Sequence, residues 1–228
     1  ANPWVNQYAT FKVFSELNDG KYWNLWDKEY IEYYQTHKNP PKTYLKKINY
    51  YCFEQYIAYK QWKHVLAYAK EKNISIIADM PFYVGVNSVD TWIHHDLFKF
   101  DENYRQTEVG GVPPDYFSKE GQLWGSPIYD FEKMKLDHYS WWISRIKAQL
   151  SLCDYLRIDH FRAFDTYYVI PSESKTAING QWKIGPREEL FDELYRQLPN
   201  AKLIAEDLGE MFPSVYELRD HYRLPGMY

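Results

Sequence analysis

The chain has 228 residues, of which 45% are hydrophobic and 25% charged, enough for one globular domain or a large part of one. Its net charge of −4 argues against a nucleic-acid partner, which needs a basic face, and suits a neutral substrate. No apolar run is long enough to span a membrane, so we expect no membrane partner.

Few features bear on the cellular compartment. Residues 1–4 show no basic region followed by an apolar run, so we expect no signal peptide. The two cysteines, Cys52 and Cys153, lie far apart and outside any metal-type spacing, which favours buried free thiols. Free thiols fit a reducing compartment, and we expect a cytoplasmic protein.

The chain is expected to open with residues 1–53, a mostly helical and aromatic-rich subdomain. From residue 54 onward, an amphipathic helix is followed three times by a short β-rich run that ends in a carboxylate. The first of these helices has apolar residues at helical spacing: Ile57, Trp62, Val65, Leu66 and Ala69. Asn73 can end the helix, residues 74–78 follow as a buried strand, and Asp79 ends that strand.

Residues 80–136 are predicted to be a long irregular loop, because glycine and proline recur through them. They include Gly110-Gly111, Pro113-Pro114, Gly121, Gly125 and Pro127. A long loop that follows a barrel strand is usually functional.

The second unit has an apolar helical stripe that ends at Leu150, followed by a strand over residues 153–158 that ends at Asp159. In the third unit, Pro186 suits a first helical turn, and residues 203–205 form the strand that leads to Glu206. The apolar stripes of the two helices are Trp142, Ile143, Ile146 and Leu150, and Leu190, Phe191, Leu194 and Leu198.

The end of the chain is predicted to continue the same alternation. A helix follows Pro213, and residues 224–227 are expected to open another strand. Alternating strands and helices predict right-handed crossovers and a parallel sheet.

Two α/β architectures place functional groups at the carboxyl ends of parallel strands: the (β/α)8 TIM barrel and the doubly wound open sheet. The sequence has no G-x-G-x-x-G motif and no phosphate loop, which disfavours the nucleotide-binding open sheet. A barrel needs eight strands. The three strands identified therefore predict that residues 54–228 are the central part of a barrel, with helical and loop insertions.

Two carboxylates have neighbours that suit glycoside transfer, which needs one ionised nucleophile and one protonated acid. Arg157 precedes Asp159 by two residues on the same strand face, and a nearby guanidinium keeps a carboxylate ionised. Glu206 stands beside Asp207 after an apolar strand, where burial and a negative neighbour favour a protonated carboxyl. Each pair alone has an ordinary explanation, a buried ion pair for the first and a solvated helix start for the second.

A resemblance to a known family rests on four segments: RIDHFRAF, LIAEDLG, ADMPFYV and GVPPDYFSKEGQLWGSPIYD. Together they resemble the 4-alpha-glucanotransferase family, the amylomaltases of glycoside hydrolase family 77. The closing LPGM is similar to the family's next barrel strand, and the resemblance extends from about Trp4 onward. It implies an α-amylase-type TIM barrel that acts on α-1,4-glucans such as starch, glycogen and maltooligosaccharides.

The resemblance also implies roles for single residues. Asp159 matches the nucleophile and Glu206 the general acid/base. Three positions match substrate-binding residues: Arg157 beside the nucleophile, Asp79 on the preceding motif strand, and His160 near the acceptor side. The loop at 80–136 would cover the bound glucan through Tyr116, Phe117, Gln122 and Trp124.

The family has a third catalytic acid, in a His-Asp pair on a later strand, whose expected position lies beyond Tyr228. His95-Asp96 has the right order but lies in the long loop, ahead of the nucleophile strand. We expect no metal and no cofactor, because two carboxylates suffice for the reaction and the adjacent His94 and His95 rarely chelate together.

These observations predict a retaining 4-alpha-glucanotransferase that moves α-1,4-glucan segments onto the 4-hydroxyl of an acceptor. One alternative is a glucan hydrolase of the α-amylase type, which would release new reducing ends. The other is a non-catalytic glucan-binding fragment, because the third acid is absent. The sequence does not indicate an oligomeric state.

Overall fold

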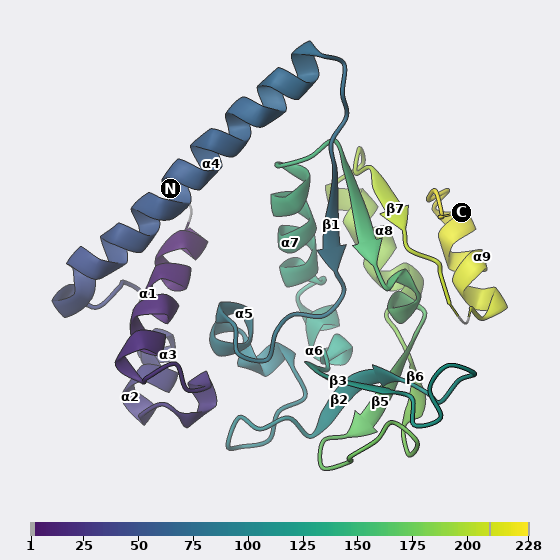
Figure 1. Ribbon diagram of the computed structural model, residues 1–228, viewed down its shortest axis with the longest axis horizontal. Coiled ribbons are helices and arrows are strands. Elements are labelled where there is room, and N and C mark those ends of the chain that lie inside the picture. The colour runs from purple at the N-terminus through teal and green to yellow at the C-terminus, as the bar shows by residue number, and fades with distance from the viewer. Residues whose placement is uncertain (1–2, 210, 228) are drawn as a thin grey trace.

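A parallel sheet lies at the centre of a mixed α/β fold, with a group of N-terminal helices on one side and an antiparallel sheet at one end (Figure 1). The computed structural model describes residues 3–209 and 211–227. The strand order is β1-β4-β7 in the parallel sheet and β3-β2-β5-β6 in the antiparallel sheet.

The N-terminal stretch is helical, as expected. Its elements are α1 (Pro3–Leu17), η1 (Trp23–Leu25), α2 (Lys28–Ile31), α3 (Tyr33–Thr36), η2 (Lys42–Tyr44) and α4 (Leu45–Glu71). Helix α4 passes through position 53 without interruption, so the backbone does not mark the division predicted there. Asn73 follows the end of α4 with a φ of 56°, and the Ile74 N–H donates to the Ala69 carbonyl at 2.9 Å. Asparagine tolerates this left-handed conformation, which explains why the helix ends here.

An aromatic cluster joins these helices to α5 (Val89–Ile93). Its buried members are Phe11, Phe14, Trp23, Trp26 and Trp92. The indole N–H of Trp92 donates to the carbonyls of Tyr30 and Ile31 at 3.1 and 3.0 Å, and that of Trp23 donates to the Val86 carbonyl at 3.0 Å. Because the buried indoles are hydrogen-bonded, they fix where the segment after β1 meets the N-terminal helices.

The three carboxylate-associated strands are parallel and belong to one sheet, as the sequence predicts. They are β1 (Ile77–Pro81), β4 (Tyr155–Asp159) and β7 (Leu203–Ala205). Strand β1 begins later than predicted and ends at Pro81, so Asp79 lies inside the strand and does not end it. The cause is the pairing with β4, in which Asp79 is opposite Arg157 and Pro81 is opposite Asp159.

Only one face of the parallel sheet is packed against helices. Leu156 and Ile158 of β4 are fully buried, whereas the alternate residues Tyr155, Arg157 and Asp159 are half-buried. The packed face meets α7 (Ser140–Leu150) and α8 (Arg187–Gln197), and α6 (Phe131–Leu136) and α9 (Pro213–His221) complete the same core. The core residues of α7 and α8 are the predicted stripes, among them Trp142, Ile143, Ile146, Leu190, Phe191 and Leu194.

The antiparallel sheet was not predicted, and it corrects both the count of three strands and the description of residues 80–136 as irregular. Its strands are β2 (Glu108–Val112), β3 (Gln122–Pro127), β5 (Thr166–Pro171) and β6 (Gln181–Ile184). The Gly110-Gly111 pair, taken for loop, lies in β2 where its register with β3 shifts, and a Cβ on Gly111 would lie 2.2 Å from the Gln122 carbonyl oxygen. Glycine at this position therefore serves a close backbone approach inside a sheet.

The strand predicted at residues 224–227 is absent from the described part of the chain, where these residues have no regular structure. They still run beside β7, because the Pro225 carbonyl accepts a hydrogen bond from the Ala205 N–H at 2.8 Å. None of the helices within residues 3–209 and 211–227 combines the length and apolar character that a bilayer-crossing helix needs.

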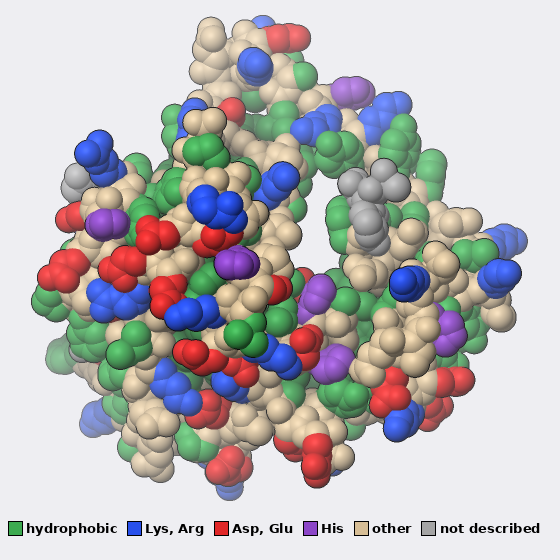
Figure 2. All heavy atoms as spheres, turned by 180° about the vertical axis from the view of Figure 1, so that it is seen from behind, with side chains coloured by type: hydrophobic (Ala, Val, Ile, Leu, Met, Phe, Trp, Pro, Cys, Tyr) green, Lys and Arg blue, Asp and Glu red, His purple; other side chains and the backbone are tan. Residues whose placement is uncertain are grey.

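Helix α4 is largely uncovered. Figure 2 shows an opening between the N-terminal helices and the rest of the molecule, and α4 bonds across it through Trp62 and Lys63, which donate to the Leu152 and Ser151 carbonyls at 2.8 and 2.9 Å. Trp62 and Val65, predicted to be buried, are exposed. They belong to an exposed row at three-residue spacing: Tyr50, Phe53, Tyr56, Tyr59, Trp62, Val65 and Tyr68. A step of three residues rotates about 60° less than one full helical turn, so the row winds around the helix.

We expect residues 1–228, expressed alone, to self-associate, because an exposed apolar surface of this extent is an association site. Phe53→Gln combined with Tyr56→Gln should shift the distribution toward monomer in sedimentation velocity. The matched control is Leu136→Gln, which removes an isolated exposed side chain on α6 and should leave the distribution unchanged. A parent chain that sediments as a single monomeric species would contradict the expectation.

Candidate active site

The carboxyl ends of the parallel strands bring the two predicted catalytic carboxylates together. Asp159 is the last residue of β4, and the Glu206 N–H donates to the Ile158 carbonyl at 3.0 Å, which continues the β4–β7 pairing by one residue. Both side chains line one cavity of about 520 Å³. Its other lining residues are Pro81, Phe82, Tyr83, Val84, Gly85, Trp124, Ser126, Arg157 and His160. The predicted convergence of Asp159 and Glu206 on the same side of the sheet is therefore confirmed.

Arg157 is the positive charge of the site. Its Nη1 donates to both carboxylate oxygens of Asp79 at 2.6 and 2.7 Å, and its Nη2 lies 3.2 Å from Oδ1 of Asp159. Burial opposes the charge of Arg157, but the hydrogen bond and charge of Asp79, with the charges of Asp159 and Glu206, outweigh it and raise the pKa of the guanidinium. The guanidinium thus places a positive charge beside Asp159 as well as beside Asp79.

Asp79 differs from the other strand carboxylates in its position. It pairs with Arg157 from inside β1, and it is not among the residues that line the cavity. Its contribution to the site is to hold the guanidinium that faces Asp159.

Glu206 is only 9% exposed, in contrast to the Asp159 side chain, which is 47% exposed. Its Oε2 accepts a hydrogen bond from the His160 backbone N–H at 2.9 Å, and its Oε1 accepts one from the Leu208 N–H, also at 2.9 Å. Two backbone donors therefore fix the carboxylate on both oxygens.

Asp207 does not act on Glu206 as the sequence suggested. Its Oδ2 accepts from Nη1 of Arg219 at 2.5 Å, and its Oδ1 accepts from the Met227 N–H at 2.8 Å. The Arg219 guanidinium neutralises the charge of Asp207. Of the two influences predicted for Glu206, burial and a negative neighbour, burial is the one that remains. Asp207 instead links the segment after β7 to α9.

His160 directly follows β4 and lines the cavity. Its ring centroid is 5.1 Å from that of Trp124 at an interplanar angle of 81°, and its Nε2 is buried with no hydrogen-bond partner among the described residues. Burial, and to a lesser extent the charge of Arg162, lowers the pKa of His160 to about 4. The imidazole is therefore neutral at physiological pH.

The four loop residues predicted to cover the substrate lie in different places. Trp124 on β3 lines the cavity, and its indole N–H donates to Oε1 of Gln122 at 3.0 Å. Tyr116 and Phe117 lie in the β2–β3 connection, are 95% and 93% exposed, and contact each other edge to face with centroids 5.4 Å apart. The structure thus brings Trp124 to the carboxylates, whereas Tyr116, Phe117 and Gln122 stand outside the cavity lining.

The sequence analysis missed the wall formed by residues 82–85, directly after β1. Tyr83 in this wall packs over β2, where a Cβ on Gly110 would lie 2.8 Å from its Cζ. Arg145 on α7 donates to the carbonyls of Pro81 and Phe82 at 2.7 and 3.0 Å and so fixes the start of the wall. The position could have been found, because the residues after a parallel strand border the site at its carboxyl end.

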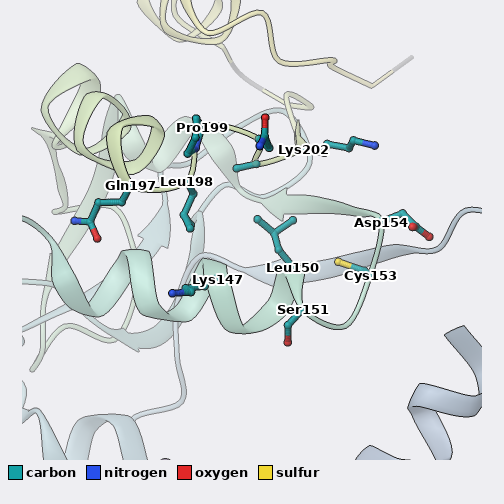
Figure 3. A pocket seen from close by; sticks show the side chains of 11 residues that line it. Lys147, Leu150, Ser151, Cys153, Asp154, Gln197, Leu198, Pro199 and Lys202 are labelled. Atoms are coloured by element: carbon teal, nitrogen blue, oxygen red, sulfur yellow. The ribbon is translucent and has the colours of Figure 1, made fainter. Parts of the chain in front are cut away.

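A second cavity, of about 480 Å³, lies at the opposite, amino-terminal end of β4 and β7. Figure 3 shows Leu150 and Leu198 pointing toward each other across it from the ends of α7 and α8. Its only acid is Asp154, which accepts a hydrogen bond from the Ile76 N–H at 2.8 Å and so has a structural role. Within the described residues, no group of three or more His, Cys, Asp or Glu side chains is arranged to hold a metal ion.

The buried His160 predicts a pH-dependent stability. Unfolded His160 gains a proton below pH ~6.5 and folded His160 only near pH 4, so the stability present above 6.5 is lost as the pH falls toward 4. In a full-length protein that contains this segment, His160→Asn should reduce the loss of unfolding free energy between pH 7 and 4.5 by about 2 kcal/mol. Urea titrations at the two pH values measure it. The exposed His64→Asn is the control, and an equal loss in both variants would refute the assignment.

Relatives with assigned names cover the whole segment. The family profile described as 4-alpha-glucanotransferase matches residues 1–228. The 4-alpha-glucanotransferase of Synechocystis sp. is 41% identical over 230 residues, which are 98% of this chain and 45% of that protein. The 4-alpha-glucanotransferase of Aquifex aeolicus is 39% identical over 227 residues, 98% of this chain and 46% of that protein. The chain thus spans about half the length of these curated relatives.

A solved structure agrees with these relatives. The amylomaltase from Streptococcus agalactiae in complex with acarbose matches with a TM-score of 0.92 at 38% identity, over 98% of this chain and 46% of that one. The backbone around the two carboxylates therefore has the course found in an amylomaltase. Sequence, fold and family profile agree, and the chain belongs to the 4-alpha-glucanotransferase family, glycoside hydrolase family 77.

Proposed function

We propose that this segment carries the nucleophile, Asp159, and the general acid/base, Glu206, of a retaining 4-alpha-glucanotransferase. The supporting observation is that the two carboxylates line one cavity in opposite environments. Asp159 is half-exposed beside a guanidinium, which favours an ionised group, and Glu206 is buried in a site that can shelter a proton before its transfer.

The chemistry proceeds in two steps. Glu206 donates a proton to the glycosidic oxygen while Asp159 attacks the anomeric carbon, which gives a covalent glycosyl-enzyme and releases the first glucan. Glu206, now ionised, then accepts the proton of the acceptor's 4-hydroxyl as that oxygen displaces Asp159. The carboxylates alone balance the reaction, so we assign it no cofactor and no metal.

The parallel sheet fits part of a (β/α)8 barrel better than part of an open sheet. All-parallel open sheets carry helices on both faces, whereas this sheet is packed against helices on one face only. The other face presents Arg157, Asp159 and Glu206, as the interior of a barrel does at its carboxyl end. We therefore assign residues 54–228 to the central part of the catalytic barrel and residues 1–53 to a helical insertion.

The substrate is proposed to be an α-1,4-glucan or a maltooligosaccharide. The similar amylomaltase from Streptococcus agalactiae was solved with acarbose. Here, Trp124 offers a ring face beside His160, and Asp79 and Arg157 shape the site around the nucleophile. Tyr116 and Phe117, with Gln122 behind them, are assigned to a cover that closes on a bound glucan and excludes water, which favours transfer over hydrolysis.

The wider assignments follow the same reasoning. Figure 2 shows basic and acidic side chains interspersed on one face of the molecule, which suits a neutral glucan better than a nucleic acid. We assign the protein to a soluble compartment of the cytoplasmic type. The third acid of the family is proposed to come from a part of the protein outside residues 1–228, so activity assays need the full-length enzyme.

Asp159→Asn in the full-length enzyme should lower transfer from maltotriose by at least about 10³-fold, because the amide cannot form the glycosyl-enzyme. Chain-length analysis of the products measures transfer, and a reducing-end assay separates it from hydrolysis. The matched control is Asp154→Asn at the other end of β4, which should retain activity. Near-normal transfer by a folded Asp159→Asn enzyme would remove Asp159 from the nucleophile role. New reducing ends without longer glucans would make the enzyme a hydrolase.

A further inference from the structure

The two catalytic carboxylates are linked by the peptide that follows the nucleophile. Asp159 ends β4, and the next residue, His160, directs its backbone N–H at Oε2 of Glu206. Oε1 is occupied by the Leu208 N–H, two residues further along the chain from Glu206 itself. The link from His160 therefore ties the carboxyl group of the acid/base to the nucleophile strand, in addition to the backbone bond from the Glu206 N–H to the Ile158 carbonyl.

The direction of the His160 N–H depends on an unusual backbone conformation. His160 has a φ of 56° and a ψ of 46°, in the left-handed region that most L-residues avoid. The turn leads into η4 (Phe161–Phe164), whose Ala163 N–H donates to the His160 carbonyl at 3.0 Å. The imidazole packs against the rings of Phe82, Tyr83 and Trp124. Packing of the imidazole ring therefore stabilises a backbone conformation at His160 that is unfavourable for most residues.

We propose that the left-handed turn at His160 positions the acid/base: its backbone N–H, together with that of Leu208, fixes the orientation of the Glu206 carboxyl group in the site. This rests on the proposed function, since it concerns the same two carboxylates. A carboxyl group keeps acceptor capacity on its oxygens whether it is ionised or protonated. The two N–H contacts can therefore orient Glu206 both before and after it gives up its proton.

The charged side chains around Glu206 are paired with one another. Arg157 on β4 is positive and faces the same cavity, and Asp159 on β4 is negative and paired with it. Asp207 is paired with Arg219 of α9, and the imidazole of His160 is neutral. The hydrogen bonds from the His160 and Leu208 N–H groups thus act on Glu206 in addition to the charge of Arg157, which faces both carboxylates. His160 is accordingly a positioning residue through its backbone, separate from any contact that its ring makes with a sugar.

The test uses two variants of the full-length enzyme, His160→Asn and His160→Leu. Their side chains have the same branched shape and both lack the imidazole, but asparagine tolerates the left-handed region and leucine does not. With maltotriose, which needs protonation of its leaving group, His160→Leu should be about tenfold slower than His160→Asn in kcat at similar KM. With α-maltosyl fluoride, whose leaving group needs no proton, first-turnover fluoride release should be nearly equal in the two variants.

A second pair guards against a leucine variant that does not fold. His160→Gly and His160→Ala differ by one methyl group, and only glycine adopts the left-handed region freely. The glycine variant should be the faster with maltotriose and equal to the alanine variant with the fluoride. Equal rates with maltotriose within both pairs, or the same loss with both substrates, would overturn the positioning role. The proposed function itself fails in a different way, if Glu206→Gln retains transfer from maltotriose.

Discussion

The parallel pairing of β4 with β1 and β7 is the constraint on which the site depends. It sets Asp79 opposite Arg157, and it allows Glu206 to continue the ladder through the Ile158 carbonyl. Because side chains alternate along a strand, a shift of one residue would turn Arg157 and Asp159 into the helix-packed core and bring Leu156 and Ile158 to the cavity. Burial of these two apolar residues therefore fixes the direction of Arg157 and Asp159.

The same register gives the two carboxylates different surroundings. Asp159 ends a strand, so water and the Arg157 guanidinium both reach it. Glu206 is buried after a shorter strand, where Leu208 in the continuation of that strand supplies one backbone donor and His160 after β4 supplies the other. The fold thus gives one carboxylate an exposed setting and the other a buried one, through the different lengths of two neighbouring strands. This separation is the general requirement for acid–nucleophile pairs in glycoside chemistry.

Sequence patterns predicted the elements whose physics is local. The apolar stripes of α7 and α8 and the three acid-associated strands were recognised because burial on one face imposes a period. The antiparallel sheet was missed, although Thr166–Pro171 is rich in β-branched and aromatic residues, because the glycines of β2 suggested a loop. Neither the pairing of Asp207 with Arg219 nor the wall at residues 82–85 could be inferred from spacing. The ion pair depends on a contact between residues of different segments, and the wall depends on the course of a loop.

The shape of the cavity depends in part on Arg145, a residue outside the cavity. It stands on α7 with its guanidinium over the rings of Trp141 and Trp142, and it holds the two carbonyls from which the cavity wall departs. Arg145 itself does not line the cavity. Libraries that randomise only the cleft residues would leave this anchor constant, and they would explore only those wall shapes that one helix on the outside of the sheet already permits.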